Sequence, residues 1–412
     1  MSAQPVFADP AAAAAPPASP FLIEADLDAA RCLRLAGSRR EVGRQHGAAL
    51  REPIARFLGD RVTRLEPLVS ARRLHEFAPL IASHTREIER VLPELAEEIH
   101  GLAEGADIAT EDAFLLQLRR ELSGFQRIPA RGDCTTFGRH AGGESIVAQT
   151  IDLNGDMAGE LNVLEIAGAP GAARPAGVAL LSFTGLVGYL GINDRGLAIG
   201  LNLVLGGQWR PGIPGYLAIR HLLERCASVD ECLDTLQALP LASSRALTIA
   251  DAARVVTVEY TPDALVVLEG AQHAHANHFL HPGLASDDAL NPFARSSSLR
   301  RLEACRELLA SLPAGADARA CLDGLARAPI EVPPTGDVRR ECTVASVAMF
   351  PARRALHVRG RPRRPRQGPE PCSGRRGAGE TGAGCPPHPT AEPATQPTPH
   401  PSEPSSSPGE IR

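Results

Sequence analysis

Apolar side chains recur with helical spacing along the first third of the chain. Between residues 41 and 126 they return every three or four positions, as they do on the buried face of an amphipathic helix. Pro93 fits a first helical turn, Thr110 begins a pattern like a capping box, and Gly124 follows the last apolar position. Helices are therefore expected within three stretches: 40–68, 72–106 and 109–124.

After Cys134 the pattern changes to an alternation of apolar and polar residues, which is typical of β-strands. Strands are expected within 144–153, 161–168, 176–183, 185–204, 244–251, 255–270, 271–278 and 342–360. Two helix pairs interrupt them: 215–226 with 228–239, which Ser228 caps, and 296–312 with 316–328. Hairpin turns such as "NDRG" and "TPDA" require antiparallel pairing. Because the helices come in blocks, we predict an α+β fold whose sheets are covered by helices.

The two ends of the chain differ in composition from the rest. Residues 1–20 are rich in Ala and Pro, and residues 363–412 consist largely of Pro, Gly, Ser and Arg. Neither end has enough large apolar side chains to offset the entropy of ordering, so both are predicted to be disordered tails. The N-terminus does not read as a signal peptide, and no apolar run reaches the roughly 20 residues of a membrane span. We expect a cytoplasmic protein without a membrane partner.

Charge and cysteine usage exclude several classes of protein. The net charge is −5, and the body of the chain has no Lys/Arg cluster interleaved with aromatic residues, so nucleic acid is not an expected partner. The nine cysteines are scattered, odd in number and without C-x-x-C spacing. This distribution argues against a disulfide framework and a zinc ribbon, and it favours buried thiols in a reducing compartment.

Cys134 stands at the threshold of the strand region, directly after the sequence Arg-Gly-Asp. A buried structural thiol is the ordinary interpretation of such a cysteine. The alternative is a nucleophile, which needs a base to remove its proton. If the peptide bond before Cys134 were cut, the new α-amino group, with a pKa of about 7.7–8.0, could act as that base.

Five sequence motifs occur in a known order between residues 33 and 362. They are "GSRREVGRQHG", "LRREL" with Arg119 and Glu121, "GDCTTFG" followed by Asp152, the hairpin "TGLVGYLGINDRGLAIGLN", and "HANHFLHP" before a closing hairpin. In this order they resemble the acyl-coenzyme A:isopenicillin N (6-aminopenicillanic acid) acyltransferase family of cysteine N-terminal-nucleophile (Ntn) hydrolases.

The resemblance implies a four-layer αββα sandwich that matures by self-cleavage. The cut would fall between Asp133 and Cys134, although the family commonly has glycine at the position of Asp133. It would separate a helical fragment, 21–133, from a catalytic fragment, 134–362, and the two fragments would remain associated.

The resemblance also implies roles for single residues. Cys134 would be the nucleophile, with Thr135 and Thr136 following it as in the family. Asp152 would orient the new amine, and the Asn277 amide would donate to the oxyanion. Arg340, or Arg339 if the alignment shifts by one, matches a family arginine near the site. Each also has a structural interpretation: Asp152 as a turn residue, Asn277 as a cap, and the arginines as solvated side chains.

Other polar residues are predicted to be structural. Glu41 and His46 lie on a helix whose glycines allow close packing, and Arg119 with Glu121 is expected to form a buried ion pair beside the site. His273 and His275 share one face of a strand, close to His278 and His281. Because this segment lies beside Asn277 and no carboxylate completes the set, we expect a structural or substrate-facing role rather than a metal site, and no other cofactor is predicted.

These observations predict a self-processing amidohydrolase or acyltransferase acting through a thioester on Cys134. Its partners would be small N-acyl amides or acyl-CoA thioesters, and the sequence leaves open whether water or an amine accepts the acyl group. Two alternatives remain. One is a thiol hydrolase that never cleaves itself and uses His140 or His275 as base, and the other is an inactive Ntn scaffold that binds acyl ligands or a partner.

Overall fold

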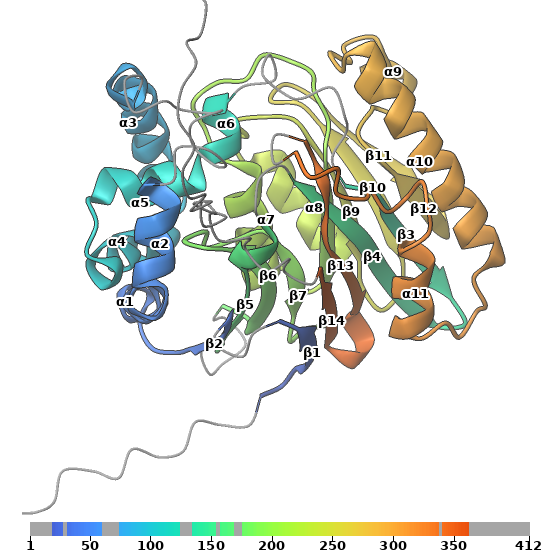
Figure 1. Ribbon diagram of the computed structural model, residues 1–412, viewed down its shortest axis with the longest axis horizontal. Helices are drawn as coiled ribbons and strands as arrows, with labels where there is room; N and C mark the ends of the chain where they lie inside the picture. The colour runs from blue at the N-terminus through green and yellow to red at the C-terminus, as the bar shows by residue number, and fades with distance from the viewer. Residues whose placement is uncertain are drawn as a thin grey trace, which may run out of the picture. The chain divides into compact units, whose positions relative to one another are not determined.

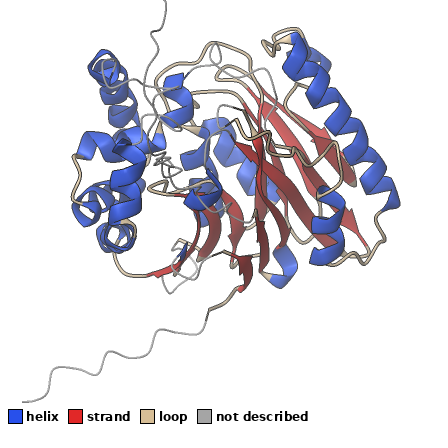
Figure 2. Cartoon of the chain, in the orientation of Figure 1, coloured by secondary structure: helices blue, strands red, loops and turns tan. Residues whose placement is uncertain are grey.

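Two β-sheets packed face to face form the centre of the computed structural model (Figures 1 and 2). The structure describes residues 19–27, 31–59, 74–123, 134–153, 157–168, 175–337 and 340–361, with the side chains of 74–76 left aside. All of these lie in one compact unit that ends at Arg363. The predicted tails, 1–20 and 363–412, lie almost entirely outside the described residues.

Within the described residues, one sheet has eight strands in the order β11-β10-β9-β8-β7-β6-β5-β2. They are β2 (Cys32–Leu35), β5 (Leu161–Ile166), β6 (Val178–Phe183), β7 (Leu190–Asn193), β8 (Ala198–Leu203), β9 (Arg245–Ala250), β10 (Val255–Tyr260) and β11 (Leu265–Glu269). Neighbouring strands are antiparallel except that β2 runs parallel to β5. The "NDRG" and "TPDA" sequences form the predicted turns of the β7–β8 and β10–β11 hairpins.

The other sheet has the order β1-β14-β13-β4-β3-β12 in the same part of the chain. Its strands are β1 (Leu22–Asp26), β3 (Thr136–Ala141), β4 (Glu144–Leu153), β12 (Gln272–His275), β13 (Cys342–Phe350) and β14 (Ala355–Gly360). Cys134 lies two residues before the β3–β4 hairpin, and β12 pairs with the outer side of β3. Two segments far apart in sequence, the β3–β4 hairpin and β12, therefore meet at the start of β3.

The layers follow the predicted α+β order. Strands β3 and β4 pack on β8 and β9 of the other sheet. Helices α10 (Pro292–Ser311) and α11 (Ala318–Leu325) cover the outer face of the six-stranded sheet, and α7 (Gly215–Arg225) with α8 (Val229–Ala238) lies on the eight-stranded sheet (Figure 1). The central strands are buried on both faces, because each sheet has a covering layer on both sides. The fold is the expected four-layer αββα sandwich.

The N-terminal region adds a group of helices beside α7. They are α1 (Arg39–Ala49), α2 (Arg51–Gly59), α3 (Leu74–Val91), α4 (Pro93–Ala106), α5 (Thr110–Gln117) and α6 (Arg119–Ser123). Helices α1 and α4 touch through their backbones at two pairs of glycines. A Cβ at Gly43 would lie 2.0 Å from the Glu98 carbonyl oxygen, and a Cβ at Gly101 would lie 2.2 Å from that of Arg40. Gly47 and Gly105 make equivalent contacts, so the predicted close packing is confirmed.

The motif around Glu41 builds the first turn of α1. Ser38 is the N-cap, and its side chain forms a reciprocal capping box with Glu41. Gly37 precedes it with a φ of +116°, a conformation that favours glycine. His46 is fully buried, and neither ring nitrogen has a hydrogen-bond partner among the described residues. Burial, together with the charge of Arg220, lowers the pKa of His46 to about 4.

Some predicted element boundaries are confirmed and others are wrong. Pro93 opens α4 and Ser228 caps α8, as predicted. Thr110 is not an N-cap: Ala109 holds that position without a side-chain bond. Helix α10 begins four residues before the predicted start, after the N-cap Asn291. Strands β1 and β2, in a region predicted to be helical, were not predicted, and neither was the short helix α9 (Pro282–Ala285). Gly124 lies outside the described residues.

Candidate active site

Cys134 lies at the start of β3, with 5% of its surface exposed. Its Sγ atom is 4.0 Å from the Tyr189 hydroxyl, just before β7 of the other sheet. Thr135 and Thr150 are paired, since the Thr150 amide donates to the Thr135 carbonyl (2.9 Å) and the Thr135 amide to the Thr150 hydroxyl (3.0 Å). The thiol therefore lies at the edge where the two sheets meet. Asp133 lies outside the described residues.

Two side chains hold the backbone carbonyl of Cys134. Asn202 on β8 donates from Nδ2 at 2.8 Å, and Arg301 on α10 donates from Nη1 at 3.1 Å. The same Nη1 reaches the hydroxyl of Thr135 at 2.8 Å. Arg301 is 1% exposed, so it places a buried positive charge next to the nucleophile candidate. A buried positive charge stabilises the negatively charged form of any group close to it.

Arg301 also connects Cys134 with Asn277. Its Nη2 donates to the Asn277 Oδ1 at 2.7 Å. Asn277 Nδ2 donates one hydrogen to the Leu203 carbonyl at 3.0 Å, and its backbone amide donates to the Ser298 hydroxyl at 2.7 Å. Because an amide nitrogen carries two hydrogens, the second N–H of Asn277 is available as a donor.

Asp152 is fully buried on β4, two residues beyond Thr150. Its Oδ1 accepts a hydrogen bond of 2.6 Å from the Thr343 hydroxyl on β13, the residue opposite in the sheet. Since Thr150 adjoins Thr135, the last residues of β4 lie beside the start of the Cys134 segment. Thr136 pairs with Gln149 on one side and His275 on the other, which fixes the direction of β3.

The structure does not bring Arg340 to this group. Arg340 is exposed, and its Nε lies 3.9 Å from the carboxylate of Asp337. Arg339 lies outside the described residues. The guanidinium that contacts Cys134 belongs to Arg301, which was not predicted. Its signal was available, because the buried positions 294, 298, 301, 305 and 308 form a helical stripe in which Ser298 and Arg301 are the polar members.

Glu121 forms a buried ion pair, but its partner is Arg245 rather than Arg119. The Glu121 Oε1 accepts from Arg245 Nη2 at 2.8 Å and from the Ser243 hydroxyl at 2.7 Å. The Arg119 guanidinium lies 5.8 Å from the ring centre of Phe57. The predicted Arg119–Glu121 pair is therefore wrong, because α6 presents Glu121 to β9.

The histidines considered above as metal ligands or bases all have hydrogen-bond partners close to them in the protein. His275 Nε2 lies 2.8 Å from Glu259 Oε1 and Nδ1 lies 2.8 Å from the Ala276 carbonyl, so both nitrogens face acceptors. Burial alone would raise the pKa of Glu259, but the hydrogen bond and charge of His275 hold it below its usual value. His278 meets Ser298 at 2.7 Å, and burial lowers the pKa of His278 to about 4.

Three further histidines also make short-range contacts. His273 meets the Gly270 carbonyl at 3.0 Å, and its pKa is lowered by burial. His281 accepts from the amide of Gly283 at the start of α9. His140 meets the Ser145 hydroxyl at 2.9 Å, near the end of β3 opposite to Cys134.

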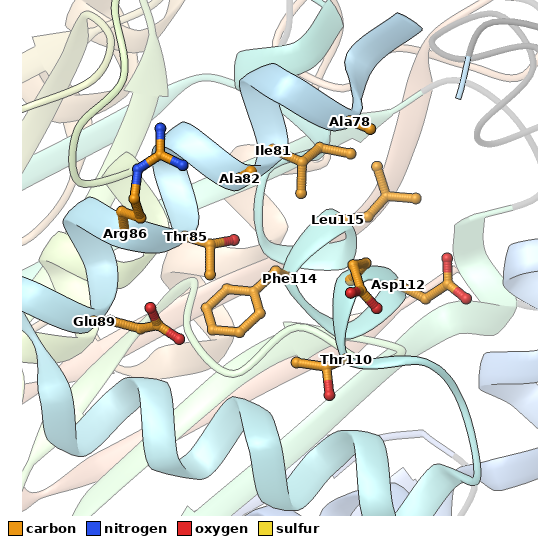
Figure 3. A pocket seen from close by; sticks show the side chains of 11 residues that line it. Ala78, Ile81, Ala82, Thr85, Arg86, Glu89, Thr110, Asp112, Phe114 and Leu115 are labelled. Carbon is orange, nitrogen blue, oxygen red and sulfur yellow. The ribbon is translucent and has the colours of Figure 1, made fainter. Parts of the chain in front are cut away.

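A pocket of about 470 Å³ between α3 and α5 has a different location (Figure 3). Ile81, Thr85, Phe114 and Leu115 line it. None of its lining residues belongs to the site around Cys134, Asn277 and Arg301. No helix in the described part of the chain combines the length and apolar character required to span a bilayer.

Comparison with known proteins gives one family. The profile of the acyl-coenzyme A:6-aminopenicillanic acid acyl-transferase family matches residues 140–357. The 40 kDa form of acyl-coenzyme A:6-aminopenicillanic-acid-acyltransferase from Emericella nidulans is 27% identical over 270 residues, which are 64% of this chain and 73% of that protein.

Solved structures give weaker similarities. Penicillin V acylase from Agrobacterium tumefaciens has a TM-score of 0.40 and 15% identity, over 55% of this chain and 83% of its own. An N-acylethanolamine-hydrolyzing acid amidase ortholog from Caenorhabditis elegans has a TM-score of 0.38 and 17% identity, over 53% and 93%.

Proposed function

Because the chain belongs to the acyl-coenzyme A:6-aminopenicillanic acid acyl-transferase family, we propose that it is a self-processing enzyme that cleaves or transfers acyl groups through Cys134. The substrates are small N-acyl amides or acyl-CoA thioesters. The observation that carries the proposal is the hydrogen-bond chain from the Cys134 carbonyl through Arg301 to Asn277 at the start of β3. These hydrogen bonds hold the thiol-bearing residue Cys134, the buried cation of Arg301 and the amide of Asn277 close together.

Maturation precedes the reaction: hydrolysis of the peptide bond between Asp133 and Cys134 consumes one water and gives a carboxyl group on Asp133 and a free α-amino group on Cys134. The new α-amino group accepts the thiol proton, and Sγ attacks the substrate carbonyl carbon. The carbonyl oxygen becomes an oxyanion. When the C–N bond breaks, the leaving amine takes the proton from the α-ammonium and a thioester remains on Cys134. Water, or a second amine, then attacks the thioester carbon and gives a proton to the α-amino group. The C–S bond breaks, the acid or new amide is released, and the Cys134 thiolate takes the proton back from the α-ammonium.

Three side chains are proposed to support these steps. The second N–H of Asn277 donates to the oxyanion, and one such donor contributes about 2.7–4 kcal/mol in comparable sites. Arg301 is a positioning residue, because it holds both the Cys134 carbonyl and the Asn277 amide. Asp152 accepts from the new α-ammonium, for which its place beside the β3 start is suitable.

A buried charge network supports continued association of the two fragments after cleavage. Arg220 of α7 lies 2.9 Å from Glu98 of α4, and Glu224 of α7 lies 2.6 Å from Arg39 of α1. Glu98 and Arg39 belong to the proposed N-terminal fragment, and the other two residues belong to the catalytic fragment. Separation would break the Arg220–Glu98 and Arg39–Glu224 pairs and leave each glutamate only the arginine of its own fragment, Arg39 for Glu98 and Arg220 for Glu224. Breaking such pairs is costly for buried charges.

The histidine contacts bear on the alternative without self-cleavage. A separate base needs a free nitrogen near the thiol. Both nitrogens of His275 face acceptors, and His140 lies at the other end of β3. Neither arrangement favours the role of base for Cys134.

Denaturing mass spectrometry of the purified protein, followed by N-terminal sequencing, tests the proposal. We expect two fragments, one of which begins Cys-Thr-Thr, and an acyl mass shift on that fragment after incubation with N-acyl amides or acyl-CoA thioesters. An intact chain that iodoacetamide labels at Cys134 would instead support the non-cleaving thiol hydrolase. An intact chain with an unreactive Cys134 would support the inactive scaffold.

A further inference from the structure

A second polar cluster lies on the opposite face of the eight-stranded sheet, at the same edge as Cys134. Asn202 reaches Cys134 from the inner face of β8. The next residue, Leu203, pairs with Arg245, and Arg245 pairs with Tyr260 on β10. Successive side chains of a strand point to opposite faces, and directly paired residues share a face. Arg245 and Tyr260 therefore point toward α6 and α7.

Two buried polar atoms in this cluster have no hydrogen-bond partner in the described structure. They are Glu121 Oε2 and the hydroxyl oxygen of Tyr260. Gly215 at the start of α7 adjoins both Tyr260 and Arg245: a Cβ there would lie 3.3 Å from the Tyr260 hydroxyl and 3.2 Å from the Arg245 Nε. Buried polar groups are normally satisfied, so two unpaired atoms in one cluster point to a ligand that completes them.

The charges of the cluster define the kind of ligand. Arg245 already neutralises Glu121, leaving one carboxylate oxygen as a pure acceptor. Burial raises the pKa of Tyr260, and Glu121 and Tyr216 add to this increase, which the charge of Arg245 only partly opposes. The Tyr260 hydroxyl therefore stays neutral and can donate or accept a hydrogen bond. A carboxamide supplies an N–H for Glu121 and a carbonyl for Tyr260. A second carboxylate would lie unfavourably next to Glu121.

Aromatic residues connect this cluster with the nucleophile. The Arg245 guanidinium lies 5.6 Å from the ring centre of Tyr216 and 5.5 Å from that of Trp209. The Tyr216 ring is 5.2 Å from the Tyr189 ring, whose hydroxyl is 4.0 Å from Cys134 Sγ. Both Tyr216 and Trp209 are only partly buried, so they adjoin solvent as well as the cluster.

We propose that Glu121 Oε2 and the Tyr260 hydroxyl bind a carboxamide-like group of the substrate, remote from the carbonyl that Cys134 attacks. This proposal rests on the proposed function and adds the substrate class: amides that carry a second, neutral donor–acceptor group. Glu121 and Tyr260 are specificity residues in this scheme. They do not touch the reacting atoms.

The test compares Tyr260→Phe with Thr257→Val in the full-length protein. Each change removes one buried hydroxyl that has no partner, and both residues lie on β10. Neither change removes a hydrogen bond, so both variants are expected to fold. The probes are matched amides whose acyl or amine portions end in a methyl or a carboxamide group, in chains of increasing length. Initial rates of amide cleavage give kcat/KM for each probe.

We expect Tyr260→Phe to lower kcat/KM for carboxamide-ended amides about 10-fold or more, and to leave methyl-ended amides and all Thr257→Val values within about two-fold. A purely structural tyrosine would affect both probe classes equally or neither, and either result overturns the subsite.

A binding measurement separates this proposal from the proposed function. Trp209 is the single tryptophan of the chain and lies against Arg245, so its fluorescence reports on the cluster. The matched carboxylic acid and amine products are titrated without any reaction. Weaker binding of the carboxamide-ended products to Tyr260→Phe supports the subsite even if Cys134 is never acylated. Equal binding to wild type, Tyr260→Phe and Thr257→Val overturns it, whether or not Cys134 forms a thioester.

Discussion

Arg301 fixes the side-chain amide of Asn277 in one orientation. Its Nη2 donates to Asn277 Oδ1 at 2.7 Å, so that oxygen is committed as an acceptor and the nitrogen must be the donor. The amide nitrogen donates one hydrogen to the Leu203 carbonyl, and its second N–H is the one that the proposed oxyanion role uses. Because Arg301 also binds the Cys134 carbonyl, Cys134 and Asn277 are both held by one planar guanidinium.

Replacing Asn277 with alanine should slow turnover without preventing folding or self-cleavage. The change removes the proposed oxyanion donor, so kcat should fall by about 10²–10³. Single-turnover kinetics with an N-acyl amide, together with denaturing electrophoresis, measure both effects. Wild-type turnover in this variant would contradict the oxyanion role.

Arg301→Lys should reduce activity more than Arg300→Lys. A lysine keeps the charge but cannot hold the Cys134 carbonyl, Thr135 and Asn277 together with two planar terminal nitrogens. Arg300 is the adjacent exposed residue of α10 and serves as the matched control. We expect kcat to drop at least about 10-fold for Arg301→Lys, with KM less affected, and to stay unchanged for the control. Equal effects of the two changes would show that Arg301 has no positioning role.

Cys134→Ala should give an uncut chain without acyl-transfer activity. The change removes the sulfur on which both the proposed self-cleavage and the thioester depend. Intact mass and amide cleavage rates are the measurements, and Cys305→Ala, which alters a buried thiol on α10, is the comparison. Two normal fragments from Cys134→Ala would remove the nucleophile assignment.

Glu98→Gln should destabilise the protein far more than Glu97→Gln. Glu98 is completely buried between Arg220 and Arg39, and breaking such a pair costs about 3–5 kcal/mol. The neighbouring Glu97 is half-exposed and pairs with Arg40 on the surface, where an ion pair contributes about 0–1 kcal/mol. Urea unfolding measures the difference, and size-exclusion chromatography shows whether fragments separate. Similar losses for both variants would mean that the network does not hold the helical region to α7.

His46 should make the protein less stable in acid. Burial lowers the pKa of His46 from 6.5 to about 4, so the unfolded chain takes up a proton there at a pH where the folded chain does not. The stability that neutral His46 allows is fully present above pH 6.5 and is lost as the pH falls toward 4, by about 1.4 kcal/mol per pH unit.

Urea unfolding of wild type and His46→Leu at several pH values measures this contribution. As the pH falls from 6.5 to 4, the free energy of unfolding of wild type should decrease relative to that of His46→Leu. A difference that stays constant with pH would show that His46 is protonated in the folded protein.

Apolar periodicity predicted most of the layers because the central strands and the covering helices are buried along regular stripes. The segment "VALLSF" is apolar except for Ser182 and is buried throughout, and α10 has a regular buried stripe. Strands β1 and β2 escaped prediction for the opposite reason. Each lies at a sheet edge with alternate residues exposed, and each pairs in parallel with a strand distant in sequence. No local pattern reports such a pairing.

The site could be predicted in part. Cys134, Asp152 and Asn277 stand in recognisable short motifs, and the structure places Cys134 and Asn277 on the same arginine. Arg301 stands in a helix beside Arg300, and only its place in the buried stripe 294, 298, 301, 305 and 308 distinguishes it from the exposed arginine. Arg340 was chosen by its order along the chain, but a position in sequence does not determine whether a side chain faces solvent.

The glycine contacts between α1 and α4 fix the distance between two charged residues on these helices, Arg39 and Glu98. With main chain against main chain, neither helix can slide or rotate without atomic collision. Arg39 on α1 and Glu98 on α4 therefore face α7 at a fixed distance from each other, which matches Glu224 and Arg220 of α7. Alanine in place of Gly43 or Gly101 would do more than widen a gap. It would shift the whole helix and carry its charge out of reach of Arg220 and Glu224.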